Sequence, residues 1–407
     1  MERQGLRGYD PYDALNSPVL RLFTFGHKYA RIAAIQTLKR CPINLRPMLL
    51  IRKDWNPKGL GLFLWGYAKL HRLQTGTPLP APYLRTINHQ PSTSNRQPPP
   101  PGSCSLNPQR LPPALDQIDR LLDLLADLRS RNCSGHGWGY NFDWQSRAFF
   151  VPKGTPTIVN SSFIGHALLD TYAHTGRERA LGLALPIKDF ILKDLNRTVD
   201  RDSFCFSYTP IDHLAVHNAN LLGASLLIRL QRYDRDTRAR DAALGALRYS
   251  MRRQQTDGSW WYADTDYQRW IDSFHTGFNL QAIRYFLEEG YGEGYREAYQ
   301  RGVRFYAENF FLPDGTAKYY HDRLEPLDIH SFAQAVVFFS GEGKGYRELA
   351  GRVLQRMIEL FQSPKGYFYF QRRGRRLIKI PYMRWSQAWA FHALTEYLLK
   401  RASTNES

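Results

Sequence analysis

Two short segments of the sequence place an aspartate close to a histidine. Asp272 precedes His275 in WIDSFHTG, and Asp328 precedes His330 in LDIHSFA. An imidazole titrates near neutral pH, and a neighbouring carboxylate can orient it as a general acid or base. Asp272, His275, Asp328 and His330 are therefore candidate catalytic residues. The alternatives are a hydrogen-bonded structural role for each histidine and helix capping for each aspartate.

Both segments belong to a pattern that recurs six times along the chain. The aligned segments are NPKGLG from Asn56, NSSFIG from Asn160, NANLLG from Asn218, DSFHTG from Asp272, DIHSFA from Asp328 and WSQAWA from Trp385. From Asn160 onward their starts lie 54 to 58 residues apart, and every sixth position is glycine or alanine. The spacing predicts six similar units, and the small residue predicts close approach of a neighbouring helix.

Each aligned segment opens a helix with apolar periodicity, and a second amphipathic helix precedes it. These preceding helices are predicted at about 12–38, 112–131, 178–195, 236–254, 292–309 and 345–362. Repeated helical hairpins bury a continuous core only by stacking side by side. The fold class predicted is all-α: an (α/α)6 toroid of six helical hairpins. Aromatic runs in its loops predict short β-ribbons: GWGYNFDW, SFCFSYTP, GSWWYAD, GTAKYYHD and GYFYFQRR.

In such a ring the N-termini of the inner helices meet at one mouth, where free N–H groups and helix dipoles favour anions. The candidate substrate-binding residues there are Asp143, Trp144, Asn160, His217, Asn218, Asn220, Trp270, Trp385 and Gln387. Asparagine suits the hydroxyl groups of a glycan, and tryptophan can stack on a sugar ring. The alternatives are capping for the asparagines and packing for His217 and the tryptophans.

Three cations fall in the same loops. Arg269, Lys379 and Arg384 could pair with a uronate carboxylate or a phosphate, or could be solvated surface charges. The whole chain carries 55 Lys and Arg against 37 Asp and Glu, a formal net charge of +18, which favours an anionic partner. Motifs of RNA- and DNA-binding modules are lacking, so no nucleic acid partner is expected.

The 407 residues, 43% of them hydrophobic, predict a single toroid domain over 1–407 with a Pro-rich surface insertion at about 74–113. Neither a transmembrane segment nor a signal peptide is expected, so the predicted location is cytoplasmic, with a peripheral position at the membrane left open. The four cysteines lie far apart, without metal-ligand spacing. No metal and no cofactor are expected.

The segment QQTDGSW, with Gln254, Asp257, Gly258 and Trp260, resembles the QxxDGxW repeat of terpenoid cyclases and prenyltransferases. This resemblance implies an α/α toroid, but the DxDD and DDxxD motifs of those enzymes are lacking. Over nearly the whole chain, segments including YDPYDALNSP, INLRPMLLI, NPKGLGLF, WIDSFHTGFN and MRWSQAWAF are similar to hairpin-toroid proteins of bacterial and archaeal exopolysaccharide biosynthesis.

The resemblance implies a carbohydrate-active protein of cell-surface polysaccharide biosynthesis or modification. Its expected partner is an anionic oligosaccharide or lipid-linked glycan, together with polysaccharide-synthesis proteins. The paired acids and histidines favour an enzyme using acid/base chemistry: a hydrolase, a lyase or an epimerase that abstracts a sugar C5 proton. Two alternatives stay open: a non-catalytic glycan-binding or assembly protein, and an enzyme like the terpenoid cyclases and prenyltransferases.

Overall fold

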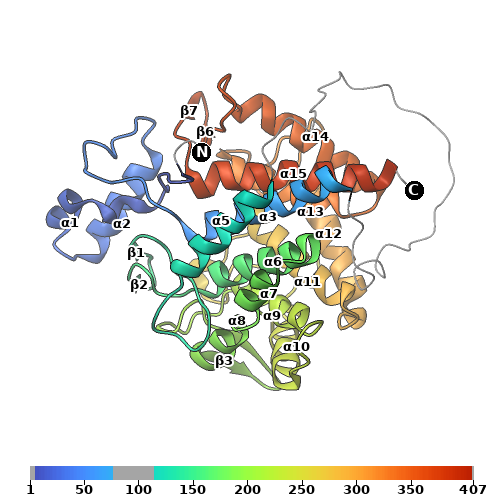
Figure 1. The fold of residues 1–407 in the computed structure, drawn as a ribbon. Helices are drawn as coiled ribbons and strands as arrows, with labels where there is room; N and C mark the ends of the chain where they lie inside the picture. The colour runs from blue at the N-terminus through green and yellow to red at the C-terminus, as the bar shows by residue number, and fades with distance from the viewer. Residues whose placement is uncertain (1–4, 77–113, 406–407) are drawn as a thin grey trace.

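The computed structural model describes residues 5–76 and 114–405. Its centre is a ring of six helices: α3 (Pro57–Thr75), α6 (Ile158–Thr175), α9 (His217–Leu230), α11 (Ser273–Glu288), α13 (Ile329–Ser340) and α15 (Trp389–Asn405). Each packs on the next in this order, and α15 packs back on α3, so the ring closes (Figure 1). The predicted α/α toroid is confirmed. Of the predicted insertion, residues from 77 on lie outside the described part.

Outer helices surround this ring. They are α5 (Ala114–Asp127), α7 (Glu178–Ala184), α10 (Thr237–Met251), α12 (Arg296–Phe310) and α14 (Lys344–Phe361). They pack in turn on α3, α6, α9, α11 and α13, the inner helix that precedes each in the chain. After α7 the chain continues through α8 (Ile187–Asp189) and the π-helical segment η4 (Phe190–Asp194). Most residues of the inner helices are buried, whereas the outer helices bury one stripe, as their amphipathic sequences predict.

The predicted small residues allow the inner helices to approach closely. A Cβ atom added at Gly61 would lie 2.8 Å from the Ile164 side chain of α6, and one added at Gly165 would lie 2.5 Å from Leu226 of α9. Both distances are shorter than a van der Waals contact between carbon atoms. Glycine at the sixth position therefore sets the spacing of the ring, as predicted.

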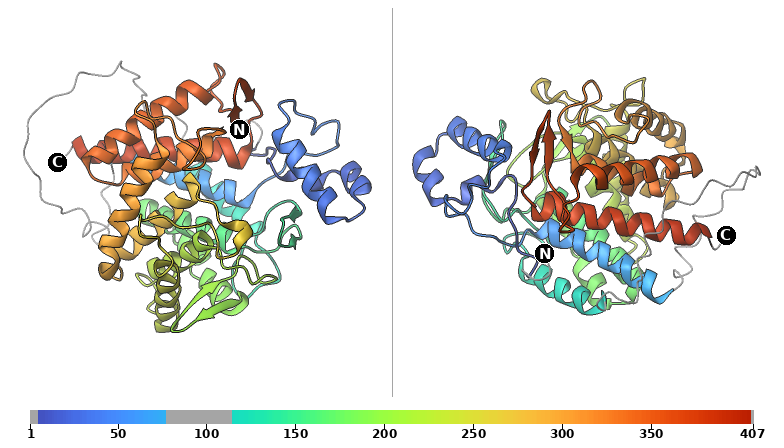
Figure 2. Two further views of the ribbon diagram at one scale, coloured as in Figure 1. Left: turned by 180° about the vertical axis from the view of Figure 1, so that it is seen from behind. Right: turned by 90° about the horizontal axis from the view of Figure 1, so that it is seen from above.

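The prediction of an outer helix at 12–38 is wrong. This stretch forms a 3₁₀ turn, η2 (Asp13–Asn16), and two short helices, α1 (Pro18–Thr24) and α2 (Lys28–Arg40). The chain breaks between them because Phe25 and Gly26 adopt positive φ angles of 45° and 74°. These elements form a small core of their own and pack beside the β1–β2 hairpin, so they project from the ring (Figure 2). Residues 13–53 are called the N-terminal lobe below.

Three of the five predicted β-ribbons contribute to strands. Antiparallel pairs join β1 (Trp144–Gln145) to β2 (Phe150–Val151) and β3 (Arg197–Asp200) to β4 (Ser203–Phe206). A three-stranded sheet has the order β5 (Leu327–Asp328), β6 (Gln371–Arg373), β7 (Arg376–Ile378). The ribbons GSWWYAD and GTAKYYHD make isolated bridges, such as Val216 with Ala263. These loops lie at the N-terminal ends of the inner helices and connect them to the outer layer.

Candidate active site

The first turns of the inner helices differ in how they are capped. Asn56, Asp272 and Asp328 each accept a hydrogen bond from a backbone N–H of the first turn, as N-cap residues do. The capping alternative for Asn160 and Asn218 is wrong, because α6 and α9 begin earlier and both asparagines lie inside the first turn. The Nδ2 and Oδ1 atoms of the Asn160 side chain and the Oδ1 atom of Asn218 are buried without a hydrogen-bond partner in the described structure.

Asp272 and His275 form a hydrogen-bonded pair at the start of α11. The Nδ1 atom of His275 lies 2.7 Å from Asp272 Oδ2, which also accepts a hydrogen bond from Trp270 Nε1 at 2.9 Å. Asp272 Oδ1 accepts the backbone N–H of His275 at 3.1 Å. The aspartate side chain is 1% exposed and the histidine side chain 22%. The carboxylate is thus fixed by three contacts, and it orients an imidazole that solvent can reach.

A small open pocket lies beside this pair. It is lined by Asn218, Trp260, Trp261, Tyr262, Trp270, Asp272, His275, Thr276 and Asn279. Tyr262 stacks on Trp270 with ring centres 4.6 Å apart and planes inclined by 11°, and it also contacts the His275 ring at 4.6 Å. The Oδ1 atoms of Asn218 and Asn279 have no partner in the described residues. A buried carbonyl oxygen without a partner is costly, so the pocket suits a ligand or water that donates hydrogen bonds.

Asp328 and His330 do not form a comparable pair. The Asp328 carboxylate accepts hydrogen bonds from Trp385 Nε1 at 2.8 Å, Gln371 Nε2 at 2.7 Å and the backbone of His330 at 3.0 Å. The His330 ring stacks on Phe274 at 4.4 Å, and neither of its nitrogens has a hydrogen-bond partner among the described residues. Burial and the nearby Lys58 ammonium lower the pKa of His330 well below its usual value, so its imidazole is neutral.

An aromatic wall separates His330 from His275. The rings of Phe274 and Phe278 each contact both histidines, at centre distances between 4.3 and 5.9 Å. Trp389 closes the other side, 4.5 Å from His330. The two histidines therefore occupy successive layers of one region: His275 borders the pocket, and His330 lies deeper, where it is 1% exposed.

Sequence reasoning missed Lys58, which lies beside this wall. Its ammonium group is 3.9 Å from the Phe163 ring centre, and the residue is 3% exposed. Burial and then the charge of Arg384 lower its pKa well below the usual value, and it forms no ion pair with a carboxylate of the described residues. The repeat contained a signal for it, because Lys58 occupies the third position of its unit, as His330 does.

Arg384 is not a solvated charge. It is 3% exposed and makes two hydrogen bonds to Asp10, at 2.7 and 2.8 Å. Asp10 lies in the segment YDPYDALNSP, so an N-terminal segment meets the residues just before α15 at the mouth of the ring. Of the other predicted cations, Arg269 pairs with Asp266 at the surface, and Lys379 lies 5.8 Å from the Tyr369 ring centre.

Several of the other predicted substrate-binding residues are bonded within the fold. Asn220 accepts from Phe206 N and donates to Ala246 O, and Gln387 makes two hydrogen bonds to the backbone of Phe368. His217 lies between Ser250 and Asp264, with Nε2 at 2.9 Å from the carboxylate.

Asp143 closes its own loop through the backbone N–H of Lys153. Trp144 packs against Tyr140, Phe149 and Tyr208. Trp385 binds Asp328 and contacts His330. The structure therefore brings Asn218, Trp270, Asp272 and His275 together at the pocket, with His330, Trp385 and Asp328 behind them.

The QQTDGSW segment holds helices together. Gln254 Nε2 donates to Gly258 O and to Ala298 O of α12, and Trp260 Nε1 donates to Ser250 O. Gly258 has a φ of 95°, and a Cβ atom there would lie 2.6 Å from the backbone of Arg301. Asp257 accepts the N–H of Ser259. These contacts account for the motif as a structural turn.

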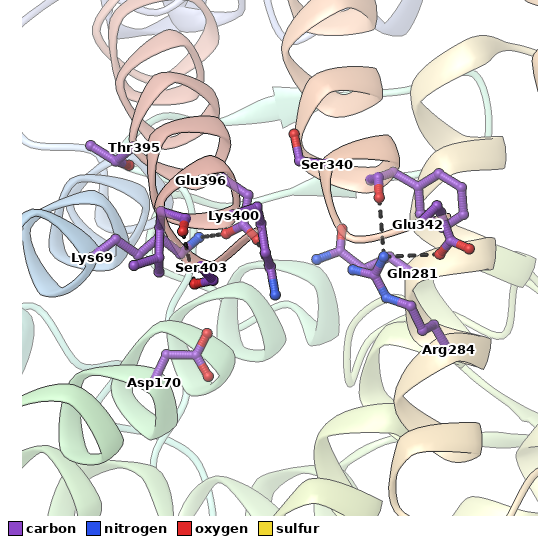
Figure 3. A network of polar contacts seen from close by, with 12 residues as sticks. Lys69, Asp170, Gln281, Arg284, Ser340, Glu342, Thr395, Glu396, Lys400 and Ser403 are labelled. Atoms are coloured by element: carbon purple, nitrogen blue, oxygen red, sulfur yellow. Dashed lines mark hydrogen bonds and ion pairs between the residues drawn. The ribbon is translucent and has the colours of Figure 1, made fainter. Parts of the chain in front are cut away.

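A second polar layer lies deeper in the ring, about 18 Å along the helices from their N-termini at 1.5 Å per residue. Three ion pairs cross alternate helix interfaces: Lys69 with Glu396, Asp170 with Arg229, and Arg284 with Glu342. Figure 3 shows the first and the third of these pairs. The three pairs join α3 to α15, α6 to α9, and α11 to the end of α13. Trp65, His166 and His392 stack between them. This layer fills the end of the ring opposite the pocket.

No set of three or more His, Cys, Asp or Glu side chains in the described ranges is arranged to hold a metal ion. None of the described helices is both long and apolar enough to span a bilayer.

Comparison with known proteins supports the fold. No protein-family model and no curated protein sequence matches the chain. Among solved structures, the chain is similar to a sugar epimerase from a ruminal bacterium, with a TM-score of 0.59 and 14% identity over 86% of this chain and 90% of that one. It is similar to cellobiose 2-epimerase from Bacillus thermoamylovorans, with a TM-score of 0.58 and 11% identity over 85% and 88%. It is also similar to a GH76 α-mannanase from Bacteroides thetaiotaomicron, with a TM-score of 0.59 and 12% identity over 88% of this chain and 90% of that one.

Proposed function

We propose that this protein is a carbohydrate-active enzyme that uses His275 as a general acid or base and Asp272 to orient it. The observation that carries the proposal is the 2.7 Å contact between the buried carboxylate and the half-buried imidazole at an open pocket. Asp272 holds Nδ1, so Nε2 is left to exchange a proton with substrate. The similar solved structures include two sugar epimerases and a mannanase, which supports a sugar as the substrate.

The pocket suits a sugar for two reasons. The Tyr262 and Trp270 rings offer an aromatic face on which a pyranose can pack. The Oδ1 atoms of Asn218 and Asn279 lack donors, which sugar hydroxyl groups would supply. Water can also satisfy these oxygens, and a bound sugar would displace it.

We further propose that the substrate is anionic: an oligosaccharide or lipid-linked glycan of cell-surface polysaccharide production. Lys58 is buried without a carboxylate partner in the described structure, and burial lowers its pKa well below the usual value. An acidic substrate group beside it would favour the charged ammonium and pair with it. The net charge of +18 and the resemblance to exopolysaccharide biosynthesis proteins support the same class. Partner proteins of polysaccharide synthesis belong to this proposal.

A non-catalytic glycan-binding protein is the second candidate. Asp272 and Asp328 are both helix N-caps, and capping alone gives each aspartate a structural purpose. In that case the pocket binds a glycan and His275 does no chemistry. The terpenoid alternative has less support, because Gln254 and Trp260 of QQTDGSW are engaged in structural hydrogen bonds.

The test is a panel of uronate-containing and neutral oligosaccharides offered to the wild type and to three variants. We expect His275→Ala to lower kcat about 10²- to 10⁴-fold with little change in substrate affinity. His330→Phe keeps the aromatic wall and should retain most activity, and the exposed His213→Ala is the matched control. Equal binding without product by all four proteins would favour the binding protein. Failure of every glycan to bind would refute the carbohydrate proposal.

A further inference from the structure

The N-terminal lobe exposes an unusual amount of apolar surface. Of the fourteen large hydrophobic side chains exposed in the described residues, seven lie in this lobe. Four surround the turn between α1 and α2: Leu22 at 66% exposure, Phe23 at 70%, Phe25 at 83% and Tyr29 at 69%. The others are Ile43, Met48 and Leu50 in the loop that follows α2. Exposed apolar side chains concentrated in one small region mark an interaction surface.

The turn itself holds an aromatic ring outward at a conformational cost. Phe25 has a φ of 45°, in the left-handed region that a bulky side chain seldom adopts. Glycine is the usual residue at such a helix C-cap, and Gly26 follows directly with a φ of 74°. The small core of the lobe uses Leu15, Ile35 and Leu38 instead, so the exposed rings contribute nothing to it.

The lobe is also strongly basic. Between Asp13 and Asp54 the chain has eight Lys and Arg and no Asp or Glu. Of these, Arg21, Lys28, Arg40 and Arg52 are exposed, and none makes an ion pair with a described residue. Arg21 and Lys28 flank the exposed aromatic turn. Cations around exposed apolar side chains are typical of proteins that bind an anionic lipid bilayer, whose headgroups are negatively charged and whose interior is apolar.

We propose that the N-terminal lobe docks on an anionic lipid bilayer, with Phe23 and Phe25 inserted at the headgroup level and Arg21 and Lys28 paired with lipid phosphates. The lobe projects from the ring, so a flat surface can reach it (Figure 2). It also borders the mouth, because Tyr12 contacts Trp385 and Lys39 donates to the Tyr12 hydroxyl at 2.6 Å. Docking therefore brings the mouth of the ring close to the bilayer. The inference goes beyond the proposed function and does not depend on it.

The test measures co-sedimentation of the full chain with vesicles of phosphatidylcholine alone and of phosphatidylcholine containing phosphatidylserine, at low and high salt. We expect binding only to the second, weakened by salt. Each cation near an anionic surface contributes about fivefold, so Arg21→Gln/Lys28→Gln should weaken binding roughly 25-fold. Phe23→Ser/Phe25→Ser should weaken it at least about tenfold, and circular dichroism checks that each variant is folded.

Two control variants match these changes away from the lobe. Arg301→Gln/Arg304→Gln removes two exposed charges on α12, and Val199→Ser/Ile211→Ser removes two exposed apolar side chains. Both should bind like the wild type. If control and lobe variants lost the same amount of vesicle binding, the binding would be due to the overall charge and the proposal would be overturned. Absence of binding to anionic vesicles would also overturn it.

A dimer that Phe23→Ser/Phe25→Ser dissociates would identify a second copy as the occupant instead. His275→Ala should bind vesicles normally, which separates this result from the proposed activity.

Discussion

The ion pair between Lys69 and Glu396 closes the ring, and its removal should be costly. Lys69 lies on α3 and Glu396 on α15, and they are 3% and 8% exposed. Burial alone would raise the pKa of Glu396, but the ammonium groups of Lys69 and Lys400 outweigh it and hold this pKa at about 2. The carboxylate is therefore ionised at neutral pH, and water screens the pair little.

We expect Lys69→Met to lower the free energy of unfolding by about 3 kcal/mol, because it leaves a buried carboxylate with a weaker partner. That partner is Lys400, whose Nζ lies 4.0 Å from Glu396 Oε1. Glu396→Gln should cost a similar amount, since an amide oxygen can accept from Lys69 but carries no charge opposite the buried ammonium, whose other hydrogen-bond contact is His392 Nδ1 at 3.2 Å. The double variant Lys69→Met/Glu396→Leu should cost far less than the sum, because no unpaired charge remains buried.

Equilibrium urea unfolding followed by circular dichroism measures these differences. Lys400→Met is the matched control: its side chain is 45% exposed, so it should cost no more than about 0.5 kcal/mol. The reasoning would be refuted if Lys69→Met lowered the free energy of unfolding no more than Lys400→Met does. It would also be refuted if the losses of the two single variants added up in the double variant, because the pair would then not stabilise the closed ring.

Three further outcomes are expected. Asp272→Asn should lower kcat roughly 10²-fold or more, because an amide cannot hold the His275 imidazole in the same tautomer. The variant should still fold, because asparagine can also cap α11. Unchanged turnover would contradict the role given to His275. Stability should fall as the pH drops below about 6.5, by about 1.4 kcal/mol per pH unit for each of His166 and His392, because burial lowers both pKa values and only the unfolded chain binds these protons. A urea midpoint equal at pH 7.5 and 5.5 would rule this out. Gly258→Ala should destabilise by more than about 1 kcal/mol, since its φ is positive and its Cβ would meet backbone, and a thermal shift assay detects this.

The period of the sequence was enough to predict the ring. Regular spacing located the inner helices, and the glycines at their sixth positions, such as Gly61 and Gly165, pack as expected. The contact between Asp272 and His275 was also accessible, because residues three apart in a first helical turn lie on one face. These features are local or repeated, which is why a single sequence reveals them.

Other features depend on contacts that no local pattern encodes. Asn220 looked like a hydroxyl-binding residue, but β4 and α10 supply its partners. Arg384 looked like a surface charge, but its partner Asp10 lies 374 residues earlier in the chain. The apolar periodicity at 12–38 suggested one helix, and the left-handed turn at Phe25 divides it. In each case tertiary structure outweighed the local signal.

The contacts that close the ring have a consequence for biosynthesis, because they join segments far apart in the sequence. The α3 helix packs on α15, which is made after every other helix of the ring, and the Asp10–Arg384 pair forms only when both of its segments are present. During translation the emerging chain therefore carries an apolar helix face whose partner does not yet exist. Contacts of such high sequence separation slow folding and prolong the exposure of aggregation-prone surface. A chain shortened before α15 would leave an open arc of hairpins, and expression of this protein should depend on chaperones more than its helical content suggests.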